Sequence, residues 1–470
     1  MYEPGSLDGR LFGLSRKALV VAILWLHSLV VGASENTCSR VGGDMDPCAK
    51  YTPVLPNVAI NQAVERVLCA SPEIDEARAW LGIAHENLNA VRALYLPRLS
   101  LGGEAVTGTL SYNYRSEAVA SLKGRDNQLA AAASLDWLLY DFGHKSALMA
   151  NGEYQERAAL ADRDQAALMQ GVQAAGFYYQ VVASREALTS ARQILTAAIR
   201  NSTMAVEQYR SGVASLSDKL QAEVVVANAR YVMSNAEGEY RSNLGTLNVM
   251  MGIPACTTLV LTTPLEVIVA KDFFTDLGRL MDQAGDQYPA LRAAKLRLRA
   301  AEYSVTGAKT SNNPTIALTA RSDLQSVYEA SEFSQPAAIS SRSFGVSINI
   351  PLYDGGLQSA QVRAASADER AAKDQLLSVQ RDADTQAWKS YQALMTGARN
   401  IIILQAMVQQ AETSFDVVSG RYKSGVGSMI EVLNALNTLA LTKNQSVQAQ
   451  LAWRQARLKL VSFLGEVSAG

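Results

Sequence analysis

The sequence is short of the residue types that most catalytic and nucleic-acid-binding sites require. Its 470 residues include three histidines and four cysteines, and neither set has the spacing of a zinc site. The net charge is −1 with 19% charged residues, so no basic block points to nucleic acid as a main partner. No phosphate-binding glycine loop, dinucleotide-binding turn or activated nucleophile is present. We therefore expect no enzyme activity, no cofactor and no metal. If the function of the protein requires energy, a partner must supply it.

Long apolar runs are also scarce. Residues 18–31 form one, preceded by Arg16 and Lys17 and followed by small residues at 32–34. This pattern predicts a secretory signal peptide over residues 1–33. The alternative is a retained anchor helix, although the run is short for a span of about 20 residues. No later run suits a membrane helix, so entry into a membrane would require a closed β-barrel.

Two of the cysteines lie in residues 34–57, a turn-rich stretch that we expect to be an irregular lead-in. Cys38 and Cys48 flank a loop that contains glycine and proline. In an oxidising compartment they could form a disulfide. Free thiols at both positions are an equal alternative.

The chain repeats itself once. The stretch RYKSGVGSMIEVLNA at residues 421–435 matches QYRSGVASLSDKLQA at residues 208–222, with an offset of 213 residues. The two Leu-Tyr-Asp turns, at Tyr140 and Tyr353, keep the same offset. A period this long predicts a tandem domain duplication and not a solenoid.

The duplication sets the expected domain boundaries. The first repeat covers residues 58–253, a connecting or equatorial segment covers 254–276, and the second repeat covers 277–466. Each repeat is expected to contain a helix, a strand pair, a very long helix, a turn and a second long helix.

Residue periodicity supports this order of elements. Apolar residues alternate with small or polar ones in segments 98–140 and 315–352, and this predicts one strand pair in each. Proline-free stretches from His144 to about Arg210, and from the second Leu-Tyr-Asp turn to about Tyr422, predict helices on the order of 100 Å long. A helix of this length indicates a coiled coil or a helical tube.

Four strands in one chain cannot close a barrel, and an open sheet edge cannot face lipid. We therefore expect several chains to share one barrel with cyclic symmetry, with eight strands from two chains or twelve from three. The alternative from a different class is a structural periplasmic coiled-coil scaffold. Such a scaffold would not need duplicated amphipathic strand pairs.

The arrangement resembles the TolC family across essentially all of residues 57–465. The resemblance rests on the order of elements, the strand entries at 97–100 and 314–317, the Leu-Tyr-Asp turns and the two Tyr-x-x-Gly-Val turns. It implies a mixed α and β fold, with a trimeric 12-stranded membrane β-barrel, four strands per chain, continued by a long periplasmic α-helical barrel. It also implies location in the bacterial outer membrane, extending into the periplasm.

The same resemblance implies a function and partners. The homotrimer would be the passive exit duct of a tripartite export system, with a periplasmic adaptor (membrane fusion) protein and an ABC or other energised inner-membrane transporter. The substrate class implied first is a protein toxin exported by type I secretion, because the N-terminal residues are similar to those of a toxin-exporting member. Multidrug efflux of small molecules is the alternative.

The resemblance further assigns an aperture gate at the periplasmic tip. The tip turns contain Gly212, Val213, Gly425 and Val426, while Ser217, Asp218 and Tyr422 match residues that hold the aperture closed. A basic gate residue of the family falls at Gly427, so Arg421 or Lys423 would have to replace it.

Glu431 and Asn434 match a pair of lumen-facing acids, of which only the first is kept. In a trimer, Glu431 would form a lumenal charge ring at the periplasmic entrance and favour ions of opposite sign. The alternative is an ordinary acidic residue at a helix N-terminus, where the helix dipole favours it.

Overall fold

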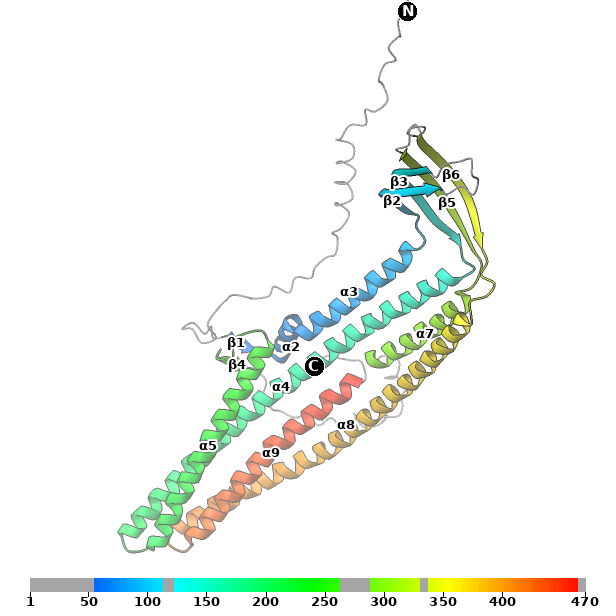
Figure 1. The fold of residues 1–470 in the computed structure, drawn as a ribbon. Coiled ribbons are helices and arrows are strands. Elements are labelled where there is room, and N and C mark those ends of the chain that lie inside the picture. Colours follow the sequence, from blue (N-terminus) through cyan, green and yellow to red (C-terminus); the bar gives the residue numbers. More distant parts are fainter. Residues whose placement is uncertain (1–54, 113–121, 263–287, 330–336, 464–470) are drawn as a thin grey trace, which may run out of the picture. The chain divides into compact units, whose positions relative to one another are not determined.

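The computed structural model describes residues 55–112, 122–262, 288–329 and 337–463 (Figure 1). All of them belong to the second of two compact units, residues 1–43 and 44–470. The predicted signal peptide and both Cys38 and Cys48 lie outside the described residues. Cys69, in the helix Ile60–Ala70, is disulfide-bonded.

The described part of the chain alternates helices with strands. Its helices are α2 (Ile60–Ala70), α3 (Pro72–Ala93), α4 (His144–Arg210), α5 (Leu216–Met250), α7 (Pro289–Thr310), α8 (Leu357–Lys423) and α9 (Met429–Phe463). Its strands are β1 (Leu55–Val58), β2 (Arg98–Tyr112), β3 (Leu122–Tyr140), β4 (Leu259–Leu261), β5 (Thr315–Glu329) and β6 (Ala337–Asn349). None of the described helices has both the length and the apolar character needed to cross a bilayer.

The internal duplication is confirmed in element lengths. Helices α4 and α8 each have 67 residues, and α5 and α9 each have 35. At the rise of an α-helix, 67 residues extend about 100 Å. Each 67-residue helix begins after a glycine in the left-handed region, Gly143 at φ 99° and Gly356 at φ 89°. A side chain there would be strained, so glycine marks the point where strand becomes helix.

The strand-to-helix corner is fixed by an aspartate in both copies. Asp141 accepts hydrogen bonds from the amides of Gly143 at 3.3 Å and Lys145 at 2.7 Å. Asp354 does the same for the amides of Gly356 at 2.9 Å and residue 358 at 2.8 Å. These carboxylates satisfy amides that the first helical turn leaves without partners.

The larger sheet has the antiparallel order β2-β3-β5-β6. Register places one set of side chains on an apolar face: Leu99, Leu101, Leu135, Trp137, Leu318, Phe344 and Val346. The opposite face holds Ser100, Ser134, Asp136, Arg321 and Ser343, and the Ser100 and Ser134 hydroxyls are 2.7 Å apart. Leu101 and Phe344 are 84% and 76% exposed, so no described residue covers them on the apolar face.

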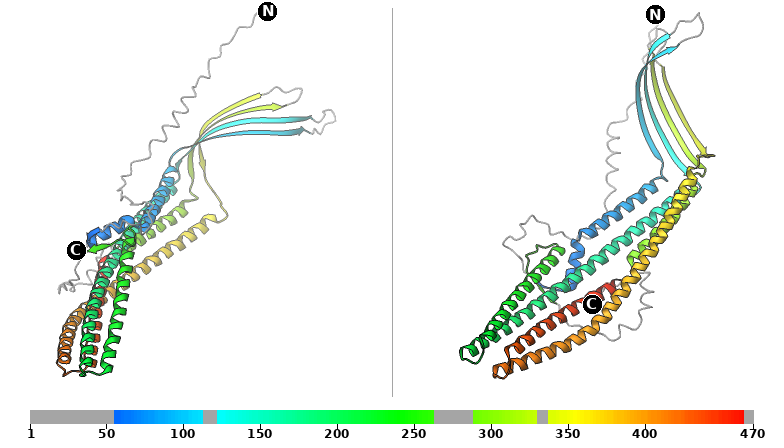
Figure 2. Two further views of the ribbon diagram at one scale, coloured as in Figure 1. Left: turned by 90° about the vertical axis from the view of Figure 1, so that its left-hand side faces the viewer. Right: turned by 60° about the horizontal axis from the view of Figure 1, so that its bottom comes forward.

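Helix α4 contacts α2, α3, α5, α7 and α9, while α8 packs against α7 and α9 (Figures 1 and 2). The largest buried cluster joins α4 to α2, α5 and the parallel pair β1-β4. At its centre the Tyr178 hydroxyl donates to the carbonyl of Val58 at 2.9 Å. Helices α4 and α5 are joined by one turn, and α8 and α9 by another. The two turns lie side by side (Figure 2).

Candidate functional site

The candidate site is built from the turn between α4 and α5 and the turn between α8 and α9. Both turns reverse the chain through a glycine with φ 75°, Gly212 and Gly425. In each, the amide of the next residue, Val213 or Val426, donates to a carbonyl five positions back, at 2.9 and 3.1 Å. The two valine side chains are each 69% exposed. The predicted tip residues therefore occupy equivalent positions in two nearly identical helix-ending turns.

The turns differ in what the following acid does. In the first, Asp218 and Ser215 form a capping box, with Ser215 N to Asp218 Oδ2 at 3.2 Å and Asp218 N to Ser215 Oγ at 3.1 Å. In the second, the amide of Glu431 donates to Ser428 Oγ at 3.3 Å. The Glu431 carboxylate instead lies 3.9 Å from the guanidinium of Arg421.

Tyr422 is the most buried of the predicted gate residues, at 3% exposure. It packs with small and apolar side chains of both copies, among them Ala205, Ala222 and Met429. Its hydroxyl has no hydrogen-bond partner among the described residues. Burial raises the pKa of the Tyr422 hydroxyl, and the negative charge of Asp218 raises it further.

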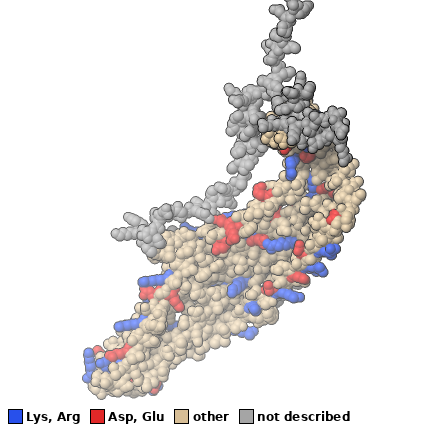
Figure 3. Space-filling model, viewed as in Figure 1, with Lys and Arg blue, Asp and Glu red and all other residues tan. Residues whose placement is uncertain are grey.

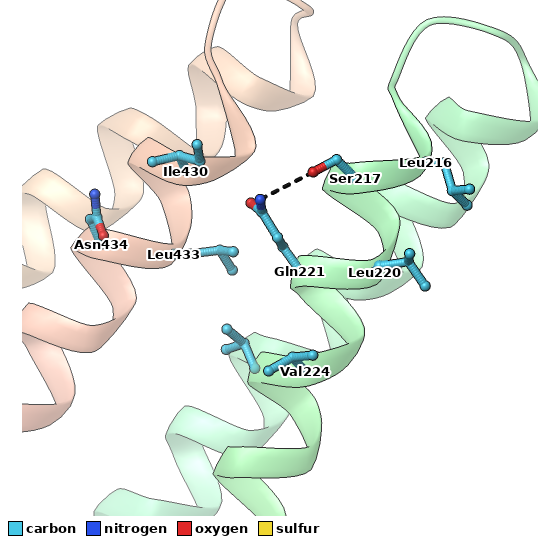
Figure 4. A pocket seen from close by; sticks show the side chains of 9 residues that line it. Leu216, Ser217, Leu220, Gln221, Val224, Ile430, Leu433 and Asn434 are labelled. Atoms are coloured by element: carbon cyan, nitrogen blue, oxygen red, sulfur yellow. Dashed lines mark hydrogen bonds between the residues drawn. The ribbon is translucent and has the colours of Figure 1, made fainter.

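The predicted gate residues are neighbours without being bonded to one another in the described chain. Asp218 is close enough to act electrostatically on Tyr422, but its Oδ2 serves the capping box. Ser217 Oγ accepts a hydrogen bond from Gln221 Nε2 at 3.2 Å (Figure 4). The gate contact itself thus stays a prediction.

A different bond joins the two turns. Gln208 Nε2 donates to the backbone carbonyl of Tyr422 at 3.1 Å. No sequence pattern predicted a role for Gln208, although the repeat alignment places it opposite Arg421. The one signal in the sequence was that both aligned side chains can donate hydrogen bonds.

An open groove of about 660 Å³ lies between α5 and α9 at this end of the bundle (Figure 4). Its lining is mostly apolar: Leu216, Leu220, Val224, Val225, Ile430 and Leu433, with Ser217, Gln221 and Asn434. Asn434 therefore lies at the groove. The predicted lumenal role of Asn434 and Glu431 requires an assembly of several chains, so it stays a prediction for this single chain.

A side chain at position 427 would be crowded. A Cβ there would lie 3.0 Å from Tyr422 N and 3.2 Å from both the carbonyl carbon and the Cβ of Arg421. Two of these three atoms are backbone of the last turn of α8, so they cannot swing away. A basic residue at this position would therefore require the end of α8 to shift by a few tenths of an ångström.

The electrostatic surface is mixed. Lys and Arg are interspersed with Asp and Glu along the face shown in Figure 3. Among the described residues, no group of three or more His, Cys, Asp or Glu side chains is placed to hold a metal ion. The features that distinguish the tip are thus its paired turns, its buried tyrosine and its ion pair.

Comparison with protein families matches residues 63–253 and 280–466 to the outer membrane efflux protein family. The matched ranges cover well over half of the chain. The chain therefore belongs to this family, the TolC-like outer-membrane channels that extend into the periplasm. It is an outer-membrane export channel and not an enzyme.

Characterised relatives span most of the chain. Protein CyaE of Bordetella pertussis is 27% identical over 431 residues, which cover 90% of this chain and 87% of that protein. Outer membrane protein TolC of Escherichia coli is 23% identical over 438 residues, covering 87% and 82%. The solved outer membrane protein VceC of Vibrio cholerae has a TM-score of 0.72 at 21% identity, covering 86% of this chain and 96% of that one. The last comparison confirms the predicted mixed α and β fold.

Proposed function

We propose that three copies of this chain close one twelve-stranded sheet and one helical tube, and that the assembly is the passive exit duct of a type I secretion system. The observation that carries the proposal is the four-stranded sheet. Its outer strands, β2 and β6, have a strand neighbour on one side only among the described residues. One face is apolar and the other polar, as a wall between lipid and water requires.

Closure follows from the edges. Unpaired backbone groups are costly in lipid, so β2 of one copy must pair with β6 of the next. Three copies close the ring with twelve strands. Since α4 and α8 continue from β3 and β6, the tube has the same symmetry as the sheet. Its far end is formed by the tip turns.

The partners follow from what the chain lacks. It carries no nucleotide-binding motif, so an energised inner-membrane transporter must drive export, and a periplasmic adaptor must connect that transporter to the tip turns. The substrate proposed is a protein toxin, as the similarity of the N-terminal residues implies. A second candidate is small-molecule efflux, favoured by relatives such as the pyoverdine export outer membrane protein OpmQ of Pseudomonas aeruginosa.

Deletion of the chain separates the two substrates. Type I secretion predicts loss of an exported protein from the medium with little change in antibiotic sensitivity. Raised antibiotic sensitivity with unchanged secreted protein would contradict toxin export and favour efflux. Complementation with the intact chain controls for effects on neighbouring genes.

The gate belongs to the same proposal. Ser217, Asp218 and Tyr422 hold the aperture closed once neighbouring copies are present. Each hydrogen bond contributes only about 0.5–1.5 kcal/mol, so docking of a partner can break several together.

The double variant Asp218→Ala with Tyr422→Phe should raise single-channel conductance. Tyr209→Phe, at the equivalent and 40% exposed position in the first copy, is the matched control. Equal conductance of the double variant and wild type would remove the gate assignment.

A further inference from the structure

We infer that Arg421 neutralises Glu431 at the periplasmic entrance, so that the entrance discriminates only weakly between cations and anions. The inference rests on the proposed trimeric duct, in which Glu431 faces the lumen. It assigns a selectivity-determining role to a residue on the last turn of α8. A bare ring of carboxylates would instead favour cations.

The first support is the ion pair itself. Arg421 Nη1 and Glu431 Oε2 are 3.9 Å apart across the second turn, and the side chains are 55% and 48% exposed. At this exposure the pair adds little to stability. Its effect on passing ions is different, because a positive charge beside each carboxylate cancels most of the field that the carboxylate sends into the lumen.

The second support is the comparison between copies. Asp218 occupies the position equivalent to Glu431, and it folds back onto Ser215 in a capping box. The residue equivalent to Arg421 is the neutral Gln208, which donates to a backbone carbonyl. The longer glutamate and the arginine thus occur together, in the copy where they make a pair.

The third support is the lack of another charge on that helix surface. From Val432 to Thr442, α9 has no ionisable side chain, and the next is Lys443. Asn434 stands where a second acid would have reinforced the ring. A basic side chain at position 427 would be crowded, because its Cβ would lie 3.0 Å from Tyr422 N. Among the described residues, Arg421 is the cation that forms an ion pair with Glu431.

The test is the reversal potential of single channels in planar bilayers under a potassium chloride gradient. Arg421→Gln should raise the cation-over-anion permeability ratio by up to about 25-fold, because a unit charge about 4 Å from an ion in water changes the ion's population about fivefold, in opposite directions for a cation and an anion. Arg421→Lys keeps the charge and should restore a ratio near wild type. Arg210→Gln removes the same charge from the equivalent end of α4 and is the matched control.

The outcomes separate the inference from the function it rests on. A ratio in Arg421→Gln that matches wild type, or a shift no larger than that of Arg210→Gln, overturns the neutralising role while leaving the duct intact. Absence of any channel in the wild-type protein overturns both. The yield of assembled protein on a non-denaturing gel shows whether each variant still folds.

Discussion

Replacing Gly427 with alanine tests the packing of the second turn directly. The added Cβ would lie 3.0 Å from Tyr422 N and 3.2 Å from the carbonyl carbon of Arg421. Contacts this short force the end of α8 to move by a few tenths of an ångström. Overpacking of this kind costs about 1–3 kcal/mol. The reduced freedom of the unfolded chain offsets about 0.4–1 kcal/mol, so a net loss is expected.

Gly420→Ala is the matched control, with the same chemical change in the last turns of α8, just before the turn that contains Gly427. Gly420 lies in α8 seven residues earlier, and a Cβ there would meet no atom within 4 Å. Alanine is about 0.8–1 kcal/mol better than glycine inside a helix, so this variant should be stabilised. The two substitutions are thus expected to have effects of opposite sign.

The assay is hydrogen exchange of the full-length protein in detergent, read at the Val426 amide. That amide donates to the Arg421 carbonyl and closes the turn at 3.1 Å. Gly427→Ala should speed its exchange by about tenfold, which corresponds to about 1.4 kcal/mol. Gly420→Ala should slow it or leave it unchanged. If both variants slow exchange, the turn has room at position 427 and the crowding inferred there is wrong.

Three further outcomes are expected. Phe344→Arg puts a charge on the apolar face of β6 and should lower the amount of protein inserted in outer membranes, at a cost of about 2–4 kcal/mol. Ser343→Arg, on the polar face, should be tolerated. Equal yields of the two variants would contradict the assigned faces. Burial raises the pKa of Tyr422, so above about pH 10 the unfolded state loses this proton first, and stability should fall as pH rises. Tyr422→Phe should flatten that slope of the denaturation midpoint, and an unchanged slope would show that other groups cause it. Asn248→Ala removes donors to two backbone carbonyls, at 2.7 and 3.1 Å, and should cost about 1–3 kcal/mol in denaturant unfolding; a loss below about 0.5 kcal/mol would contradict this role.

The backbone of this protein follows closely from sequence patterns. Long proline-free runs suffice to place α4 and α8, because nothing in them interrupts the helical hydrogen bonds. Alternation at 344–350 reveals a half-exposed strand for an equally local reason. The repeat offset then transfers each local pattern to the other copy. Closure into an assembly follows only from the physical cost of sheet edges.

The tip was less predictable because its contacts depend on side-chain length and on which helices meet. Ser215-x-x-Asp218 is a capping-box pattern. The family resemblance instead predicted that Asp218 is part of the aperture gate. The contact between Arg421 and Glu431 crosses a turn at a spacing that no periodic rule covers. The bond from Gln208 to the Tyr422 carbonyl joins residues 214 positions apart. The crowding at Gly427 is visible only in coordinates.

Three chains that share one closed sheet should form a particle of defined mass. The most direct measurement is the mass of the assembled particle extracted from outer membranes in mild detergent, with the detergent contribution subtracted. A closed trimer should have three chain masses, in particles that conduct ions when placed in a planar bilayer. A particle of one chain mass, or of three chains that do not conduct, would contradict it.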